Sequence, residues 1–205
     1  GRPLTDAWLA EFRERRNRQL LAHLQPIRHA PEAVAAVHAL YGGRIACASG
    51  ADLFKVKLQF DKTGLARWFE GRIFSGHDQP RSKPFPDVYL AAAAALGADP
   101  RRCAVVEDTV TGVTAGVRAG ATVFGYSPPE TGHDAPGALR EAGAAANLDD
   151  DPDLAADVLG LGVEAHVRDH DMVTVLEDVV VHVEALDPHV LAEERLHTFG
   201  AEQLK

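Results

Sequence analysis

The sequence predicts an α/β fold in which a Rossmann-like parallel sheet is flanked by helices. Short apolar segments alternate with helical stretches of about ten residues, an order typical of βαβ units. With 205 residues, of which 46% are hydrophobic and 25% charged, the chain is long enough to bury one core. A lone lysine and an acidic pair stand at the ends of apolar segments, which indicates a site at one edge of the sheet.

The first half of the chain begins with an amphipathic helical pattern over 5–24, behind a Thr-Asp start. A second helix starts with Pro31 in its first turn and ends before two glycines, since glycine follows helix ends and proline suits helix starts. We expect the basic middle of the first helix to be solvated. The expected elements are helices over 5–24, 31–40, 51–60 and 64–69, and strands over 44–48 and 71–76.

The second half continues the alternation as far as about residue 148. We expect Asp87 to cap its own helix. Beyond Gly160 the composition shifts to valine and histidine, which favours strands, and the last segment has the pattern of a helix. The expected elements are helices over 86–97, 109–120 and up to 143, strands over 104–106, 122–125 and up to 148, and a final helix over 187–200.

The overall charge favours a small ligand over a polyanion. The formal net charge is −9, which repels nucleic acid and anionic membranes, so an anionic substrate has to be held by local positive groups. No apolar stretch reaches the roughly 20 residues that span a bilayer, and no signal peptide pattern is present. Cys47 and Cys103 lie in apolar segments, where buried reduced thiols are common, so we expect a cytoplasmic protein.

Four polar positions at the expected strand ends suit phosphate and metal chemistry. Ser49 offers a hydroxyl, and Gly50 lets a backbone N–H approach an anion closely. Lys83 is held between prolines and supplies a positive charge of definite reach. Glu107 and Asp108 supply the hard oxygen ligands that Mg²⁺ requires. Taken singly, each of these residues could have an ordinary structural role, as a helix cap or as a solvated lysine. Together, their pattern indicates a phosphate site.

This ordered set resembles a known family. The segments ACAS at Ser49, SKPFPDVYL at Lys83 and VVEDTVTGVTAGVRAGA at Glu107 are similar to motifs two, three and four of the haloacid dehalogenase superfamily. The likeness is greatest to its β-phosphoglucomutase-like phosphatases and mutases. It implies that Ser49 and Lys83 are catalytic and hold the transferring phosphoryl group, and that Glu107 and Asp108 help to bind Mg²⁺. It also implies a partial helical cap over 1–30, a core over 31–159 and a C-terminal appendage over 160–205.

The first motif of that family, an apolar strand ending in Asp-x-Asp-Gly, is absent from the front of the chain. In the family this strand carries the nucleophile and lies between the strands of the serine and the acidic pair, so its absence leaves two strand edges to be covered. One candidate is Asp169-x-Asp171, which would make the order of the motifs permuted. The other hypotheses are that the catalytic front lies outside this chain, or that the protein has lost catalysis.

We therefore expect a Mg²⁺-dependent phosphohydrolase or phosphomutase scaffold that acts on a small phosphorylated metabolite, most simply a sugar phosphate. The alternative is a noncatalytic phosphate-binding or interaction module that keeps the anion site without the nucleophile. The C-terminal histidines also suggest a metal site, with His166 and His170 four residues apart. In strands, however, that spacing holds the two side chains too far apart to close easily on one ion.

Overall fold

The computed structural model describes residues 5–26, 30–127, 134–150 and 179–182, with 179–182 as backbone only. In these ranges the helices are α1 (Asp6–His23), α2 (Ala30–Leu40), α3 (Leu53–Thr63), α4 (Ala66–Phe69), α5 (Asp87–Ala95), α6 (Val110–Ala119) and α7 (Pro136–Glu141). The strands are β1 (Ile45–Ser49), β2 (Ile73–Ser75), β3 (Cys103–Glu107), β4 (Thr122–Gly125), β5 (Ala146–Asn147) and β6 (Val179–His182). None of the helices described is both long enough and apolar enough to cross a bilayer.

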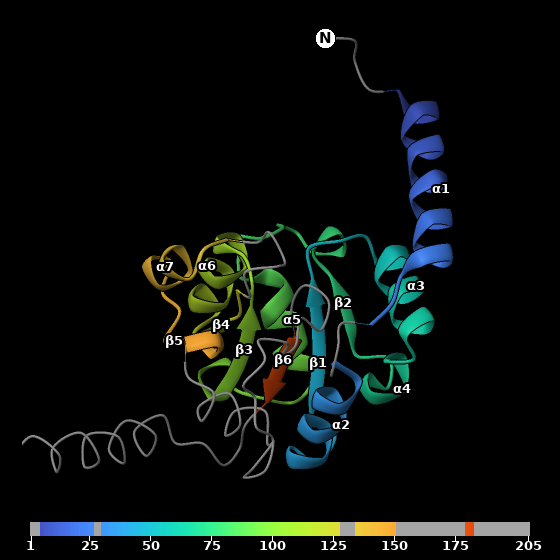
Figure 1. Ribbon diagram of the computed structural model, residues 1–205. Coiled ribbons are helices and arrows are strands. Elements are labelled where there is room, and N and C mark those ends of the chain that lie inside the picture. The colour runs from blue at the N-terminus through green and yellow to red at the C-terminus, as the bar shows by residue number, and fades with distance from the viewer. Residues whose placement is uncertain (1–4, 27–29, 128–133, 151–178, 183–205) are drawn as a thin grey trace, which may run out of the picture.

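The strands form one sheet with the order β2-β1-β6-β3-β4-β5 (Figure 1). The pairs β1–β2, β3–β4 and β4–β5 are parallel, and β1 and β3 point the same way because both run antiparallel to β6. The predicted parallel sheet flanked by helices is therefore confirmed for β1 to β5. The carboxyl ends of these strands share one edge of the sheet, the edge at which open α/β sheets bind ligands.

The central position between β1 and β3 is occupied by β6. Val179, at the start of β6, pairs with both Cys47 and Val106, whereas His182 pairs with Cys103 at the opposite end of β3. This strand covers two edges that would otherwise be unpaired inside the sheet. Its direction is opposite to that of its neighbours, so its carboxyl end lies away from the site edge. Asp169 and Asp171 lie outside the described residues.

Each face of the sheet is covered by its own set of helices, because successive strand residues point to opposite faces. In β1, Ile45 and Cys47 pack with α2, α3 and α4, whereas Ala46 and Ala48 pack with α5 and the helices beyond it. The first face includes Phe60 and Phe69, whose rings meet edge to face with centroids 4.9 Å apart. Burying such a side chain contributes about 2–3 kcal/mol, so these two layers hold the sheet rigid.

The two cysteines lie on opposite faces of this sheet. Cys47 belongs to the α2–α3 layer and Cys103 to the layer formed with α5 and α6. Both are buried, and neither forms a disulfide. Burial raises the pKa of the Cys103 thiol to about 11. The strand alternation therefore separates the thiols, as expected for reduced structural cysteines.

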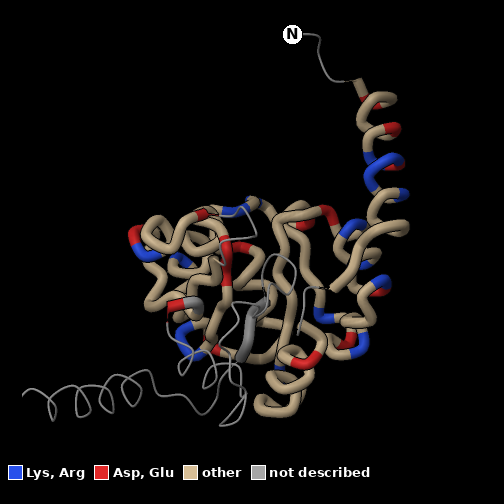
Figure 2. Tube along the Cα trace, viewed as in Figure 1, with Lys and Arg blue, Asp and Glu red and all other residues tan. Residues whose placement is uncertain are grey.

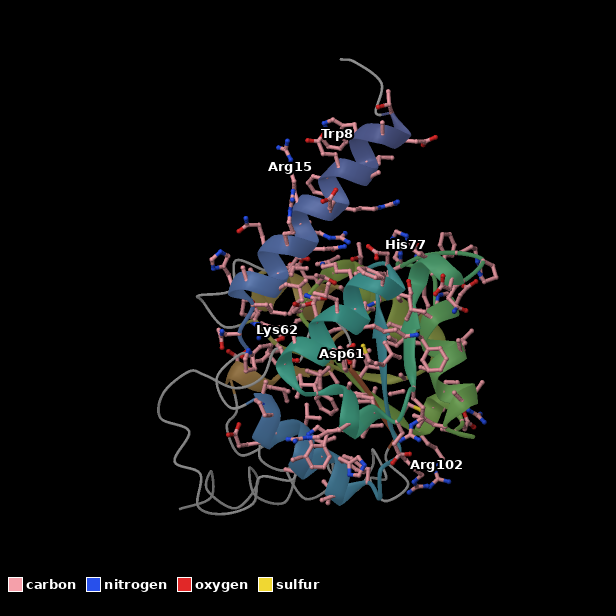
Figure 3. The ribbon with its side chains drawn as sticks, turned by 90° about the vertical axis from the view of Figure 1, so that its right-hand side faces the viewer. Trp8, Arg15, Asp61, Lys62, His77 and Arg102 are labelled. Carbon is pink, nitrogen blue, oxygen red and sulfur yellow. The ribbon has the colours of Figure 1, made fainter. Side chains whose placement is uncertain are left out.

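Helix α1 extends away from the sheet domain (Figures 1 and 3), and Thr5 caps it by accepting a hydrogen bond from the Trp8 N–H. None of its side chains is buried, and it carries charged residues of both signs (Figure 2). The expectation of a solvated basic face is wrong at Arg16, whose guanidinium lies 3.0 Å from the Asp52 carboxylate at the start of α3. This ion pair joins α1 to the loop after β1. The assignment of 1–30 to a partial cap stays a prediction.

A second local expectation also needs correction. Asp87 is the first residue of α5 and not its cap, because Pro86 occupies the cap position without a side-chain hydrogen bond. The Asp87 carboxylate instead accepts hydrogen bonds from Arg81, at 3.2 Å from Nε and 2.9 Å from Nη2. Proline is suited to a helix start because it lacks the N–H that would need a partner there.

Candidate phosphate site

The predicted site residues lie at the carboxyl ends of β1 and β3 and in the loop before α5. His77, just after β2, and Arg102, just before β3, mark the two opposite edges of the sheet in Figure 3. Lys83 and Glu107 meet directly, with Nζ and Oε1 2.7 Å apart. Ser49 ends β1 at the same edge. Ser49 and Lys83 are 34 positions apart in the chain, and Lys83 and Glu107 are 24 positions apart. They lie at the same edge of the sheet because the carboxyl ends of parallel strands lie together.

Gly76, directly after β2, lies close to the backbone at two other places. One is Ser49 at the end of β1, and the other is the segment between β2 and α5 that carries Lys83, called the lysine loop below. An added Cβ at Gly76 would lie 3.5 Å from the Ser49 carbonyl oxygen and 3.9 Å from the Ser82 Cα. The Ser82 hydroxyl also donates to the Gly76 carbonyl at 3.3 Å. The lysine loop therefore packs against Gly76 at the end of β2, and Gly76 in turn lies beside the backbone of Ser49 at the end of β1.

The β1–α3 loop holds the Ser49 hydroxyl at the start of a tight turn. Ser49 Oγ accepts a hydrogen bond from the Ala51 N–H at 3.1 Å, and Gly50 has open space where a Cβ would stand. Asp52 caps α3 by accepting from the Lys55 N–H at 2.9 Å. Burial raises the pKa of Asp52, but that backbone hydrogen bond and the Arg16 charge outweigh it, so the net pKa is lowered. Asp52, and not Ser49, therefore caps α3.

Ser75 was missed by the sequence analysis. It is buried at the end of β2, where its hydroxyl donates to the Ala51 carbonyl at 2.7 Å and accepts from the His77 N–H at 3.1 Å. These bonds fasten the serine loop to the neighbouring strand. The signal available in the sequence was a polar residue at the end of a short strand, the same signal that identified Ser49.

Glu107 is fully buried, and both of its carboxylate oxygens accept hydrogen bonds from the protein. Oε1 accepts from Lys83 and from the Tyr89 hydroxyl. Oε2 accepts from the Asp108 N–H at 3.1 Å, the Thr109 N–H at 3.3 Å and the Thr109 hydroxyl at 3.2 Å. A carboxylate with this many donors is stable in a buried site, because charge burial is tolerated only with compensating partners. Glu107 therefore organises the site around it.

Two further residues make the Glu107 position possible, and sequence reasoning missed both. Tyr89 is buried, and its ring lies 4.9 Å below the Lys83 ammonium, a cation–π distance. Burial and the adjacent Glu107 charge raise the pKa of Tyr89 well above 10, so the phenol stays a donor. In α6, Gly112 leaves the volume that the Glu107 carboxylate fills, since an added Cβ would overlap it. A glycine within a helix was the available sequence signal.

Asp108 follows Glu107 at the start of the loop into α6. It is 2% exposed, and both carboxylate oxygens are buried. The amino end of α6 is capped by other residues: Thr109 accepts from the Gly112 N–H at 3.1 Å, and Asp134 accepts from the Val110 N–H at 2.7 Å. The helix-cap reading of the acidic pair is therefore not needed to explain how α6 begins.

The donor set at this edge fits a hard divalent cation such as Mg²⁺. Asp108 presents oxygen ligands, and the adjacent Glu107 adds negative charge. Within the described ranges, no cluster of three or more His, Cys, Asp or Glu residues could enclose an ion. Mg²⁺ does not require one, because it commonly binds one or two carboxylates and takes its other ligands from water and phosphate oxygens.

Comparison with known proteins identifies the family. A model described as haloacid dehalogenase-like hydrolase matches residues 2–120, which is more than half of the chain. The chain belongs to the haloacid dehalogenase-like hydrolase family. Among curated relatives, the 6-phosphogluconate phosphatase of Escherichia coli is 34% identical over 70 residues, covering 34% of this chain and 32% of that enzyme. Two other relatives match over 40% and 20% of their lengths, so the chain spans less than half of these proteins.

Solved structures agree with this assignment. A HAD family hydrolase from Deinococcus radiodurans R1 with bound phosphate and sodium is 32% identical, with a TM-score of 0.64, and the match covers 77% of this chain and 69% of that one. A protein of Thermotoga maritima assigned as a β-phosphoglucomutase has a TM-score of 0.63 at 24% identity, covering 79% and 72%. The latter likeness concerns the fold alone. The expected family is confirmed, and a protein assigned as a β-phosphoglucomutase is among the structures that share its fold.

Proposed function

We propose that this chain is a Mg²⁺-dependent phosphohydrolase or phosphomutase scaffold that binds a small phosphorylated metabolite, most simply a sugar phosphate. The observation that carries the proposal is the buried Lys83–Glu107 pair, with its nitrogen and oxygen 2.7 Å apart, at the strand edge that also holds Ser49. Family membership and the phosphatase named among the relatives support the same chemistry. A cytoplasmic location is part of the proposal, because two buried cysteines that form no disulfide suit a reducing compartment.

In this proposal the chain's own residues bind and orient the phosphoryl group. The Ser49 hydroxyl and the Gly50 N–H donate to its oxygens, and the Lys83 ammonium neutralises part of its charge. Asp108, with Glu107 beside it, would hold Mg²⁺, which would supply further charge neutralisation at the phosphoryl oxygens. Because the side chain of Lys83 is 8% exposed, its charge acts in a partly dry site where electrostatic attraction is stronger than in water.

Hydrolysis by the family's route also needs a carboxylate nucleophile at the central strand. In the described part of the chain that position is held by β6, which runs antiparallel and begins, not ends, near the site edge. We therefore propose that this chain binds phosphate with Mg²⁺ but turns over a generic aryl phosphate very slowly or not at all. The noncatalytic phosphate-binding module remains the alternative, and it predicts the same binding without any turnover.

The test measures phosphate binding and turnover on the same preparation of the 205-residue chain. Calorimetry with inorganic phosphate and Mg²⁺ should show binding that Lys83→Ala weakens, while the exposed Lys62→Ala serves as the matched control and leaves it unchanged. Absence of binding in the wild-type chain would end the proposal. Robust Mg²⁺-dependent hydrolysis of an aryl phosphate would refute the missing-nucleophile account, and its loss in a folded Asp169→Asn variant would establish the permuted arrangement.

A further inference from the structure

Arg118, in the last turn of α6, contacts the loop that carries Lys83. Its Nη1 donates a hydrogen bond of 2.8 Å to the carbonyl oxygen of Pro84, the residue directly after Lys83. We propose that Arg118 is a positioning residue that acts through this carbonyl to hold Lys83 in reach of a bound phosphate. This inference rests on the proposed function, because it concerns the lysine assigned there to phosphate binding.

This hydrogen bond is one of several contacts between the lysine loop and the helices α5 and α6. Two guanidinium groups lie over the Phe85 ring, with Arg81 4.5 Å and Arg118 5.9 Å from its centroid. Arg81 in turn pairs with Asp87 at the start of α5. Phe85 is 42% exposed, so these two cation–π contacts supplement the partial burial that holds the ring. The loop thus contacts α5 through Arg81, α6 through Arg118 and the end of β2 through Gly76.

Helix α6 is well suited to transmit this restraint because its own place on the sheet is tightly set. Gly116 faces Val123 of β4, where an added Cβ would lie only 2.7 Å from the Val123 Cγ2 atom. The helix therefore approaches the sheet closely at its middle. Asp108 stands just before its first turn and Arg118 in its last turn. Helix α6 therefore begins beside the acidic pair and ends at the residue that contacts the loop supplying the positive charge.

A lysine side chain needs such a restraint more than a short side chain does. Its four-carbon stem can adopt many rotamers, so a fixed backbone at its base removes part of the entropy that phosphate binding would otherwise cost. Arg118 is itself exposed, so the effect on affinity should be moderate. We expect Arg118→Ala to weaken phosphate binding by about three- to tenfold, the range of one typical net hydrogen bond, because solvent weakens the charge of an exposed donor.

The test is a double-mutant cycle on phosphate affinity with Mg²⁺ present, using the wild-type chain, Arg118→Ala, Lys83→Ala and the double variant. If Arg118 acts through Lys83, its replacement weakens binding in the wild-type background and has no further effect in the Lys83→Ala background. Arg118→Lys, which keeps a charged donor, should recover part of the affinity. Arg101→Ala is the matched control, because Arg101 is exposed and pairs with Asp99 on a different loop.

The outcomes separate this inference from the proposed function. If the wild-type chain does not bind phosphate, or if Lys83→Ala binds it equally well, the proposed function fails. If Lys83→Ala weakens binding but Arg118→Ala does not, or if the two effects simply add, the positioning role is wrong. Urea midpoints establish that each variant is folded, and Arg118→Gln provides a second neutral replacement if Arg118→Ala does not fold.

Discussion

The Lys83 ammonium and the Glu107 carboxylate form a buried ion pair, with side chains 8% and 0% exposed and 2.7 Å between Nζ and Oε1. The net stability that such a buried ion pair contributes is smaller than the stability lost when one partner is removed, because the remaining partner is then charged and buried without its counter-ion. The position of the pair at the carboxyl ends of the strands therefore indicates that charge is needed there for function more than for stability. Glu107 also accepts a hydrogen bond from the Tyr89 hydroxyl, so it keeps this donor when the Lys83 side chain moves to contact a bound anion.

The stability of this pair is the first testable consequence. Lys83→Ala should lower the free energy of unfolding by roughly 3 kcal/mol, because it leaves the Glu107 charge without its cation. A Lys83→Met, Glu107→Gln double variant, which removes both charges, should recover part of that loss. Urea titration measures both values, and the exposed Lys62→Ala should change by less than about 0.5 kcal/mol. Equal loss in the single and double variants would contradict the argument.

Gly112 provides a steric test of the same site. Gly112→Ala should place a methyl group on the Glu107 carboxylate and force either that side chain or α6 to move. We expect a loss of about 2 kcal/mol or more in unfolding free energy, as for other overpacked core positions. Gly137→Ala, in α7, meets no atom within 4 Å and is the matched control. That variant should be neutral or slightly stabilising, since alanine favours helix over glycine by up to about 1 kcal/mol.

Metal binding should depend on Asp108 more than on Glu107. Protein donors already occupy both Glu107 oxygens, which leaves that carboxylate little capacity to bind a cation directly, and the family resemblance places the stricter ligand second in the pair. We expect Asp108→Ala to weaken Mg²⁺ affinity by a larger factor than Glu107→Gln, as measured by calorimetry with and without phosphate. A folded Asp108→Ala variant with unchanged Mg²⁺ affinity would remove the metal role of the acidic pair.

The two thiols should be inert in the folded protein. Cys103 has a pKa of about 11 because of its burial, so at about pH 8 the reactive thiolate is scarce, and both cysteines are covered. Its raised pKa means that the stabilising effect of the neutral thiol is complete below the ordinary value of 9.0 and is lost as the pH rises towards 11. Ellman's reagent should label two thiols in denaturant and react slowly with the native chain. Fast native labelling would contradict the described packing.

The sequence carried much of this fold and part of its site. The elements at β1, β3 and β4 were predictable because short apolar segments between helical patterns allow few other structures. Glu107 and Asp108 could be found because residues at the ends of parallel strands share one edge. Lys83 could be found because it stands between prolines in a loop that leads into a helix. Tyr89 could not, since a tyrosine within a helix is ordinary. The glycine within the helix at Gly112 was a signal of close packing, but only the tertiary structure reveals that the group it meets is Glu107.

The sequence by itself determined the α/β class, the family and the identity of the charged residues, because these depend on local periodicity and on motif spacing. Only the tertiary structure decided which segment fills the centre of the sheet: β6, a strand far along the chain that runs antiparallel to its neighbours. Likewise, only packing could direct Arg118 to the Pro84 carbonyl and Arg16 to Asp52. Such contacts join residues distant in sequence, and their formation depends on the whole surrounding structure and not on local propensity.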